Sequence, residues 1–272
     1  QGTCTGDRAH NPAKEHEALF NEAKYTQTAD KNNWKYCWAT EHHGLTEYSH
    51  ISANDVYMGY LAAQTERIHL GAGIFNLSPR VNHPVRNAEK VAMLDHLTEG
   101  RFEFGTGRGA GSHEVAAFNI HDTSSTKAEW DEVIYEIPKM WKQKGYSYPD
   151  GSAFKVPATG TQMMPNREGA FNVLPKPYAH THPAMWVAAG NPGTYEKAAK
   201  LGLGVLGFGI GSILANSPLV KIYKDTIANA EPVGDYVNDN VMNMAGIICL
   251  EDRQRAREAA TASGNTYLGS MV

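Results

Sequence analysis

The stretch RFEFGTGRGAGSHE, residues 101–114, decides between two folds. Its four glycines stand at every second position after a short apolar strand, with Arg108 among them. A dinucleotide-binding turn has the spacing G-x-G-x-x-G at the first strand–helix junction, and an acidic residue about 20 positions later ends the second strand. Here the acidic residues at that distance, Glu129 and Asp131, lie in an amphipathic helical pattern. We therefore interpret the stretch as the glycine-lined end of a later strand, the fourth of a barrel.

Strands and helices alternate on both sides of this stretch. Hydrophobic periodicity predicts strands at 35–43, 67–77, 101–107, 183–190, 204–209 and 241–250. It predicts helices at 15–31, 52–66, 83–100, 126–143, 194–202, 217–230 and 252–260. Strands that alternate with helices predict a parallel sheet. The series is close to the eight βα units of a (β/α)₈ barrel.

The fold class we predict is α/β: a single-domain (β/α)₈ TIM barrel over residues 1–272. A first strand before residue 1 and a last βα unit after residue 272 would complete the count of eight. Residues 145–183, rich in proline and glycine, are expected to be an insertion that holds a short hairpin. Pro138 is expected to kink or shorten its helix. A doubly wound sheet is the structural alternative.

Composition excludes several classes of protein. The chain has 42% hydrophobic and 20% charged residues and a net charge of −4, without a cluster of basic residues. A nucleic-acid or anionic-membrane partner would need such a cluster. No apolar run approaches the ~20 residues that cross a bilayer. Three widely spaced cysteines give no disulfide framework and favour a reducing compartment, the cytoplasm.

The first predicted strand ends in Glu41-His42-His43. On a strand, one histidine should face inward and the other outward. An inward histidine could transfer protons, because histidine titrates near neutrality, or bind a metal together with His180 and His182, or be a hydrogen-bonded core residue. The metal interpretation is the weakest, since the 180–182 pair precedes its strand and no second cluster has ligand spacing.

Other strand ends carry glycine with polar residues. Arg108 could bind a phosphate through its guanidinium, or could be a surface arginine in a turn. The turn Gly190-Asn191-Pro192-Gly193-Thr194 leads into a helix whose N-terminal N–H groups attract phosphate; the simpler interpretation makes Thr194 a plain N-cap. Gly73-Ile74 could bend its strand or let the backbone approach a planar ligand.

Four segments, taken in order and spacing, resemble the bacterial luciferase-like flavin monooxygenase family. They are WATEHHGLTEY (38–48), HLGAGIFNL (69–77), HPVRNAEKVAMLDHLTEGRFEFGTGRG (83–109) and WVAAGNPGTYEKAAKLGLG (186–204). The third is the most specific. The resemblance runs from about residue 15 to about residue 260 and implies a (β/α)₈ barrel that binds reduced FMN at the carboxyl ends of its strands.

The resemblance also implies roles for individual residues. His42 matches the family histidine that acts in flavin–oxygen chemistry, and Gly73-Ile74 matches a non-proline cis peptide against the flavin ring. Arg108 matches the arginine that contacts the FMN phosphate. The phosphate loop matches Gly190, Asn191, Gly193 and Thr194. No residue matches a metal ligand.

The chain departs from luciferase at two places in the matching segments. Gly107 stands where luciferase has a reactive cysteine, and Gly190-Asn191 stands where it has Glu-Ser. Light emission is therefore not expected, whereas FMN binding is.

The function that the resemblance implies is an FMNH₂-dependent, two-component monooxygenase. A separate flavin reductase supplies FMNH₂, and O₂ oxidises a small organic substrate through a flavin C4a-(hydro)peroxide. The resemblance also implies a homodimer formed by helices beside the second and third strands. The alternatives are a deazaflavin-dependent reductase or dehydrogenase of the same superfamily, a non-catalytic flavin-binding partner subunit, and a metal-dependent barrel hydrolase.

Overall fold

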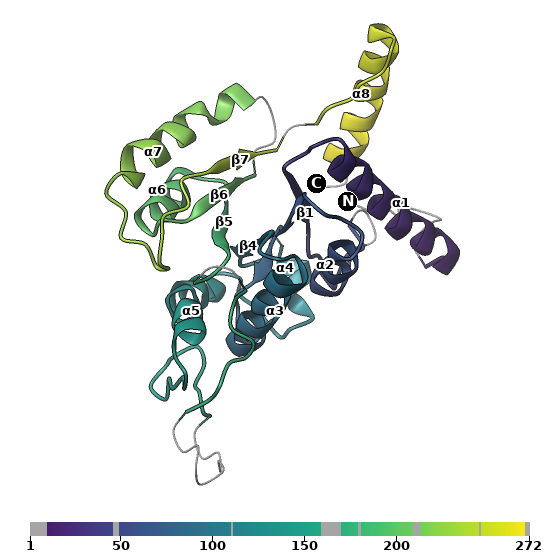
Figure 1. The fold of residues 1–272 in the computed structure, drawn as a ribbon. Coiled ribbons are helices and arrows are strands. Elements are labelled where there is room, and N and C mark those ends of the chain that lie inside the picture. Colours follow the sequence, from purple (N-terminus) through teal and green to yellow (C-terminus); the bar gives the residue numbers. More distant parts are fainter. Residues whose placement is uncertain are drawn as a thin grey trace.

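A computed structural model describes residues 10–45, 49–109, 111–158, 170–178, 181–208, 213–244 and 246–269. Its centre is a curled parallel sheet (Figure 1), with the strand order β1-β2-β4-β5-β6-β7 and with β3 paired to β4. The order in space follows the order along the chain. A doubly wound sheet reverses its order at a switch point. The doubly wound alternative is therefore wrong, and the arrangement is that of part of a barrel.

The strands are short and all their pairings are parallel. They are β1 (Tyr36–Ala39), β2 (His69–Ala72), β3 (Phe75–Asn76), β4 (Phe102–Gly107), β5 (Ala184–Ala189), β6 (Gly204–Gly207) and β7 (Val241–Asn243). The predicted strand 67–77 is divided into β2 and β3, which are separated by Gly73 and Ile74. Of the predicted strand 241–250, the described residues (241–244 and 246–250) pair with a neighbouring strand only over the first three, in β7.

Helices connect successive strands and several of them pack against the sheet, whereas the C-terminal helix stands away from it (Figure 1). They are α1 (Pro12–Lys31), α2 (Asn54–Ala62), α3 (Pro84–Leu97), α4 (Ser112–Ala116), α5 (Ser125–Lys142), α6 (Pro192–Lys200), the 3₁₀ helix η3 (Ile213–Asn216), α7 (Ser217–Ile227) and α8 (Arg253–Gly269). Within the described ranges no helix is both long enough and apolar enough to cross a bilayer.

Several helix boundaries follow directly from sequence. Proline occupies the first turn of α1, α3 and α6, where its missing N–H costs nothing. Gly100 follows α3 with a φ of 83°, a left-handed conformation that glycine adopts easily. Pro138 does not shorten α5, which continues to Lys142.

Glycine lets side chains and backbone approach closely inside the curled sheet. A Cβ at Gly105 would lie 1.8 Å from the carbonyl oxygen of Ala72 on the neighbouring strand, so no other residue fits there. The ring of Trp38 packs on Gly71, and the ring of Trp186 on Gly204. These contacts fill the interior of the sheet with aromatic rings.

Between α5 and β5 the described residues (143–158, 170–178 and 181–183) depart from the βα pattern, and residues 143–158 extend below α5 in Figure 1. Antiparallel bridges join Tyr146 to Phe171 and Tyr148 to Val156, which makes a small hairpin-like unit as predicted. Its described residues pack against α5: the Glu132 carboxylate accepts hydrogen bonds from the N–H groups of residues 152 and 153.

Candidate active site

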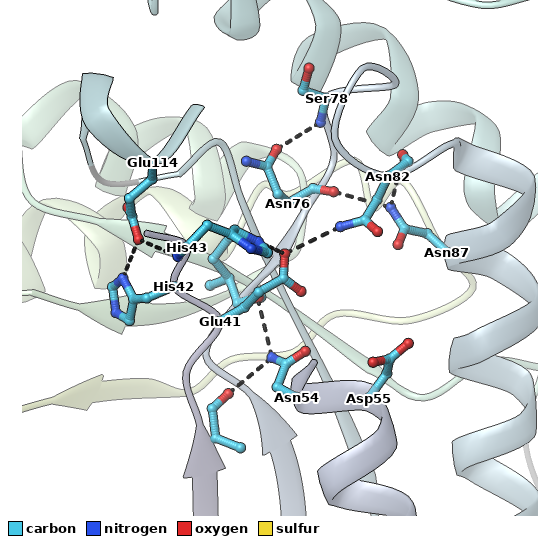
Figure 2. Close-up of polar contacts among 12 residues, drawn as sticks. Glu41, His42, His43, Asn54, Asp55, Asn76, Ser78, Asn82, Asn87 and Glu114 are labelled. Carbon is cyan, nitrogen blue, oxygen red and sulfur yellow. Dashed lines mark hydrogen bonds and ion pairs between the residues drawn. The ribbon is translucent and has the colours of Figure 1, made fainter. Parts of the chain in front are cut away.

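The loop after β1 carries Glu41, His42 and His43 (Figure 2). Because β1 ends before this loop, the two histidines do not alternate across a strand, and that expectation is wrong. Their rings instead contact two different glutamates. His42 Nδ1 lies 2.6 Å from Glu114 Oε1, and His43 Nε2 lies 3.1 Å from Glu41 Oε1.

The contact between His42 and Glu114 is short and largely withdrawn from solvent. The side chains are 14% and 7% exposed, respectively. Glu114 belongs to the short helix α4, which the sequence did not predict, and the same Oε1 accepts the backbone N–H of His43 at 3.3 Å. One carboxylate therefore fixes the His42 ring and the adjoining backbone together.

The second pair belongs to a longer polar network (Figure 2). Glu41 Oε1 also accepts Asn82 Nδ2 at 3.3 Å, and Asn82 Oδ1 accepts Lys90 Nζ at 3.1 Å. Lys90 in turn lies 3.2 Å from Asp55. The hydrogen bond that His43 donates to the Glu41 carboxylate raises the pKa of His43, although partial burial opposes this effect. This network ties the loop after β1 to α2 and α3.

A pocket lies between this loop, β3 and α4. Its lining includes Glu41, His43, Ile74, Asn76, Glu114 and Phe118. The Phe118 ring meets the His43 ring edge to face, with 5.0 Å between centroids. The pocket thus combines two carboxylates and an imidazole with apolar walls, and its volume of about 10 Å³ is close to that needed for a single water molecule.

The peptide bond between Gly73 and Ile74 is cis, as the family resemblance implied. The fully buried Asn54 lies beneath it: Asn54 Nδ2 donates to the carbonyl oxygen of Ala39 at 3.2 Å and to that of Ile74 at 3.5 Å. Asn54 therefore connects the end of β1 with the cis peptide. The hydrophobic pattern of the sequence gave no indication of this residue's position.

The Ile74 side chain explains why position 107 is glycine. A Cβ at Gly107 would lie 2.7 Å from Ile74 Cδ1 and from Ile74 Cγ1. The isoleucine thus occupies the space that a cysteine side chain at position 107 would need. The departure from luciferase at Gly107 has a steric basis in this chain.

Arg108 follows β4 with its guanidinium exposed. Its Nη1 donates to Thr126 Oγ1 at 3.3 Å and lies 3.5 Å from the carbonyl oxygen of Thr123, at the start of α5. Thr106 of β4 pairs with Val187 of β5. The two segments predicted to bind phosphate therefore leave the sheet from the ends of neighbouring strands.

The turn after β5 caps α6 through Asn191. Asn191 Oδ1 accepts the Thr194 N–H at 3.0 Å and the Thr194 hydroxyl at 3.2 Å. Thr194 lies inside the first turn of α6, so its interpretation as the N-cap is wrong. Gly190, Asn191 and Gly193 are exposed, which leaves the positive end of the helix dipole open to an anion.

The described residues offer no support for a metal centre. His182 is buried, with its ring stacked on Trp141 and Tyr236. Its Nε2 accepts the backbone N–H of Asp235 at 2.7 Å. His180 lies outside the described residues. Among the described His, Cys, Asp and Glu side chains, no group of three is placed to hold a metal ion.

Comparisons with known proteins show which sequences this chain resembles. The chain is 29% identical over 181 residues to the oxygenase component of the flavin-dependent trigonelline monooxygenase of Acinetobacter baylyi. The aligned region covers 66% of this chain and 45% of the relative. Across the first curated relatives, the matched segment is between 32% and 60% of the relative's length. The chain thus spans about a third to three fifths of those proteins.

Solved structures share the fold. A monooxygenase from Streptomyces bottropensis matches with a TM-score of 0.81 at 22% identity, covering 99% of this chain and 76% of that one. The oxygenating constituent of 3,6-diketocamphane monooxygenase from Pseudomonas putida, solved with FMN, matches with a TM-score of 0.74 at 16% identity, covering 91% and 67%.

The match to a protein family extends over nearly the whole chain. The sequence profile of the luciferase-like monooxygenases matches residues 2–271. This range includes every candidate site residue described above. The chain therefore belongs to the luciferase-like monooxygenase family.

Proposed function

We propose that this chain is the oxygenase of a two-component system, which uses FMNH₂ and O₂ to oxidise a small organic substrate. The observation that carries the proposal is the set of donors at the carboxyl ends of β4 and β5. The guanidinium of Arg108 and the N-terminus of α6 leave the sheet from neighbouring strands. This is the donor chemistry that binds a phosphate. A separate flavin reductase would be the partner that supplies FMNH₂.

The residues at this edge fit a flavin mononucleotide. Arg108 would hold the phosphate from one side, and the 190–194 turn, with its exposed glycines, from the other. Gly73 and Ile74 would lie against the flavin ring. When bound, reduced FMN supplies the electrons that activate O₂.

His42 would handle protons in this reaction. Its ring lies at the carboxyl end of β1, where catalytic residues of barrel enzymes are found. A histidine suits this task because its ordinary pKa, about 6.5, lies near neutral pH. His42 is the residue that we assign to catalysis.

Anaerobic titration with reduced FMN and, separately, with a reduced deazaflavin tests the cofactor. We expect reduced FMN to bind, and mixing with O₂ to give a transient absorbance that belongs to neither reduced nor oxidised FMN. Hydride transfer with the deazaflavin, and no O₂-dependent product with FMNH₂, would establish the reductase alternative instead. Binding of neither cofactor would refute the proposal.

Two further controls address the remaining alternatives. If this chain were a non-catalytic partner subunit, its His42→Ala variant would leave the activity of the reconstituted complex unchanged. The proposed oxygenase would instead lose activity in the same assay. A metal-dependent hydrolase would turn over without flavin and would lose activity with a chelator. Light emission is not part of the proposal.

The proposed oligomer is a homodimer that uses an exposed apolar face on α1, α2 and α3. Val56 and Leu97 are 72% and 52% exposed, and the partly exposed rings of Phe20 and Tyr60 lie 5.8 Å apart between α1 and α2. Large contiguous apolar patches typically mark contact surfaces. Sedimentation should show a dimer in the wild type and a monomer after Val56→Asp. A cytoplasmic location stays a prediction from the cysteine pattern.

A further inference from the structure

We propose that Glu114 is a positioning residue for His42: it holds the proton on Nδ1 and thereby leaves Nε2 as the nitrogen that accepts a proton. The inference rests on the proposed function for its chemical consequence. Its structural part, the tautomer of His42, can be measured in the protein without any cofactor.

The geometry of the contact determines which atom carries the proton. His42 Nδ1 and Glu114 Oε1 are 2.6 Å apart, and both side chains are mostly buried. An ionised carboxylate only accepts hydrogen bonds, so Nδ1 must be the donor. A neutral imidazole carries one proton, so with Nδ1 protonated the lone pair is on Nε2.

A second bond limits the movement of the Glu114 carboxylate. Its Oε1 also accepts the backbone N–H of His43 at 3.3 Å. The carboxylate is thus held against the loop after β1 at two points, both made by the same oxygen (Figure 2). A carboxylate restrained in this way fixes the plane of the His42 ring as well as its tautomer.

The neighbouring pair, His43 with Glu41, differs from the pair of His42 with Glu114 in what its carboxylate contacts. His43 has its own carboxylate, Glu41, and that pair continues through Asn82 to Lys90 on α3. Glu41 therefore holds the loop to the scaffold. Glu114 comes from a different helix, 72 residues away in sequence from His42. Residues 108–114 connect Glu114 with Arg108, so the predicted phosphate contact and the His42 partner lie on one short segment.

The experiment measures the His42 tautomer by nitrogen NMR in protein labelled with ¹⁵N-histidine. The resonance of His42 is assigned by its loss in His42→Gln. We expect Nδ1–H in the wild type and in Glu114→Gln, whose amide oxygen can still accept the hydrogen bond from Nδ1–H. We expect Glu114→Ala to shift the ring toward Nε2–H. Glu41→Ala is the matched control, and it should alter His43 but leave the His42 tautomer as it is.

The consequence for chemistry is measured with reduced FMN and O₂ as the probes. Glu114→Ala should change the decay rate of the O₂-dependent transient by about 10-fold or more, with reduced-FMN affinity altered less than 3-fold. An Nε2–H tautomer in the wild type, or an unchanged tautomer in Glu114→Ala, overturns the inference. Identical O₂ kinetics in a folded Glu114→Ala protein also overturns it. If the wild type binds no reduced FMN, the proposed function fails, and the NMR result decides the structural part alone.

Discussion

Two histidine–glutamate pairs lie at opposite ends of the same sheet. At the carboxyl end, His42 meets Glu114 at 2.6 Å; at the amino end, His69 of β2 meets Glu103 of β4 at 2.8 Å. Both carboxylate side chains are 7% exposed. The chemical groups are the same and the two carboxylates are equally buried, although the side chain of His69 is 34% exposed and that of His42 14%. The larger difference between the pairs lies in the surroundings of the carboxylates.

The surroundings of Glu103 are aromatic and closed. Its other oxygen accepts the indole N–H of Trp186 at 2.7 Å, and the Trp186 ring meets the Trp38 ring edge to face at 5.2 Å. Glu114 instead lines a pocket. In barrels, residues at the amino end typically serve stability and those at the carboxyl end serve catalysis. The comparison indicates that the same pair can perform either task according to which end of the sheet it occupies.

The largest expected effect separates the two histidines by activity. Replacement of His42 by alanine should lower the turnover of the reconstituted oxygenase about 10²- to 10⁴-fold, because a general acid or base is lost. His69→Ala is the matched control at the other end and should retain turnover within a few-fold. Steady-state oxygen consumption, coupled to a flavin reductase, measures both. Equal losses in the two variants would remove the functional distinction between the ends.

The next largest effect is on the free energy of unfolding and distinguishes Glu103 from Glu114. Glu103→Ala leaves the buried Trp186 N–H without its acceptor and should lower the free energy of unfolding by about 2–4 kcal/mol. Glu114→Ala should cost about 1 kcal/mol, because water can replace a carboxylate at the edge of a pocket. Urea denaturation of both variants measures the difference. If Glu114→Ala proves the more destabilising, Glu114 serves the fold rather than His42.

The scaffold of both ends could largely be predicted from sequence. Long periodic segments indicated α1, α3, α5, α6 and α7 and the strands between them, because burial on one face leaves a regular hydrophobic pattern. The residues at which strands begin and end were harder to predict from the sequence than the helices. The run 67–77 is continuous in hydrophobicity, but its interruption at Gly73 and Ile74 depends on backbone conformation.

The site could be predicted only in part. Glu114 stands six positions after Arg108 in the sequence, yet nothing in its spacing indicated His42 as its partner, because α4 brings the two together from 72 residues apart. The N-cap of α6 was a missed local signal: proline favours the first helical position, so Pro192 indicated Asn191 as the cap. His42 and Arg108 were accessible because both follow strands.

A smaller effect concerns cofactor affinity at the carboxyl end. Arg108→Ala should weaken binding of reduced FMN about 10- to 100-fold, the usual size for loss of a charged hydrogen bond to phosphate. Reduced riboflavin has no phosphate, so its affinity should not change. Arg86→Ala, which removes an exposed arginine paired with Glu89 on α3, is the control. Fluorescence or absorbance titration under anaerobic conditions measures the affinity of the wild type, Arg108→Ala and Arg86→Ala for reduced FMN and for reduced riboflavin. An equal loss for riboflavin would place Arg108 away from the phosphate.

The smallest effect concerns pH and the pair of His43 with Glu41. Glu41 raises the pKa of His43 in the folded protein, so the pair stabilises the fold below the ordinary histidine pKa of about 6.5, and this stabilisation is lost as pH rises through the raised value. His43 is 25% exposed, so we expect less than about 1 kcal/mol.

Unfolding free energies at about pH 5.5 and pH 8.5 measure this contribution in the wild type and in Glu41→Gln. The decrease from low to high pH should be smaller in the variant, because the glutamine carries no charge to favour protonated His43. All other titrating groups are common to both proteins and cancel in the difference. A decrease in Glu41→Gln as large as that of the wild type, or larger, would mean that Glu41 does not raise the pKa of His43 in the folded protein. His43 would then resemble a core histidine, and the pocket would have a single functional pair.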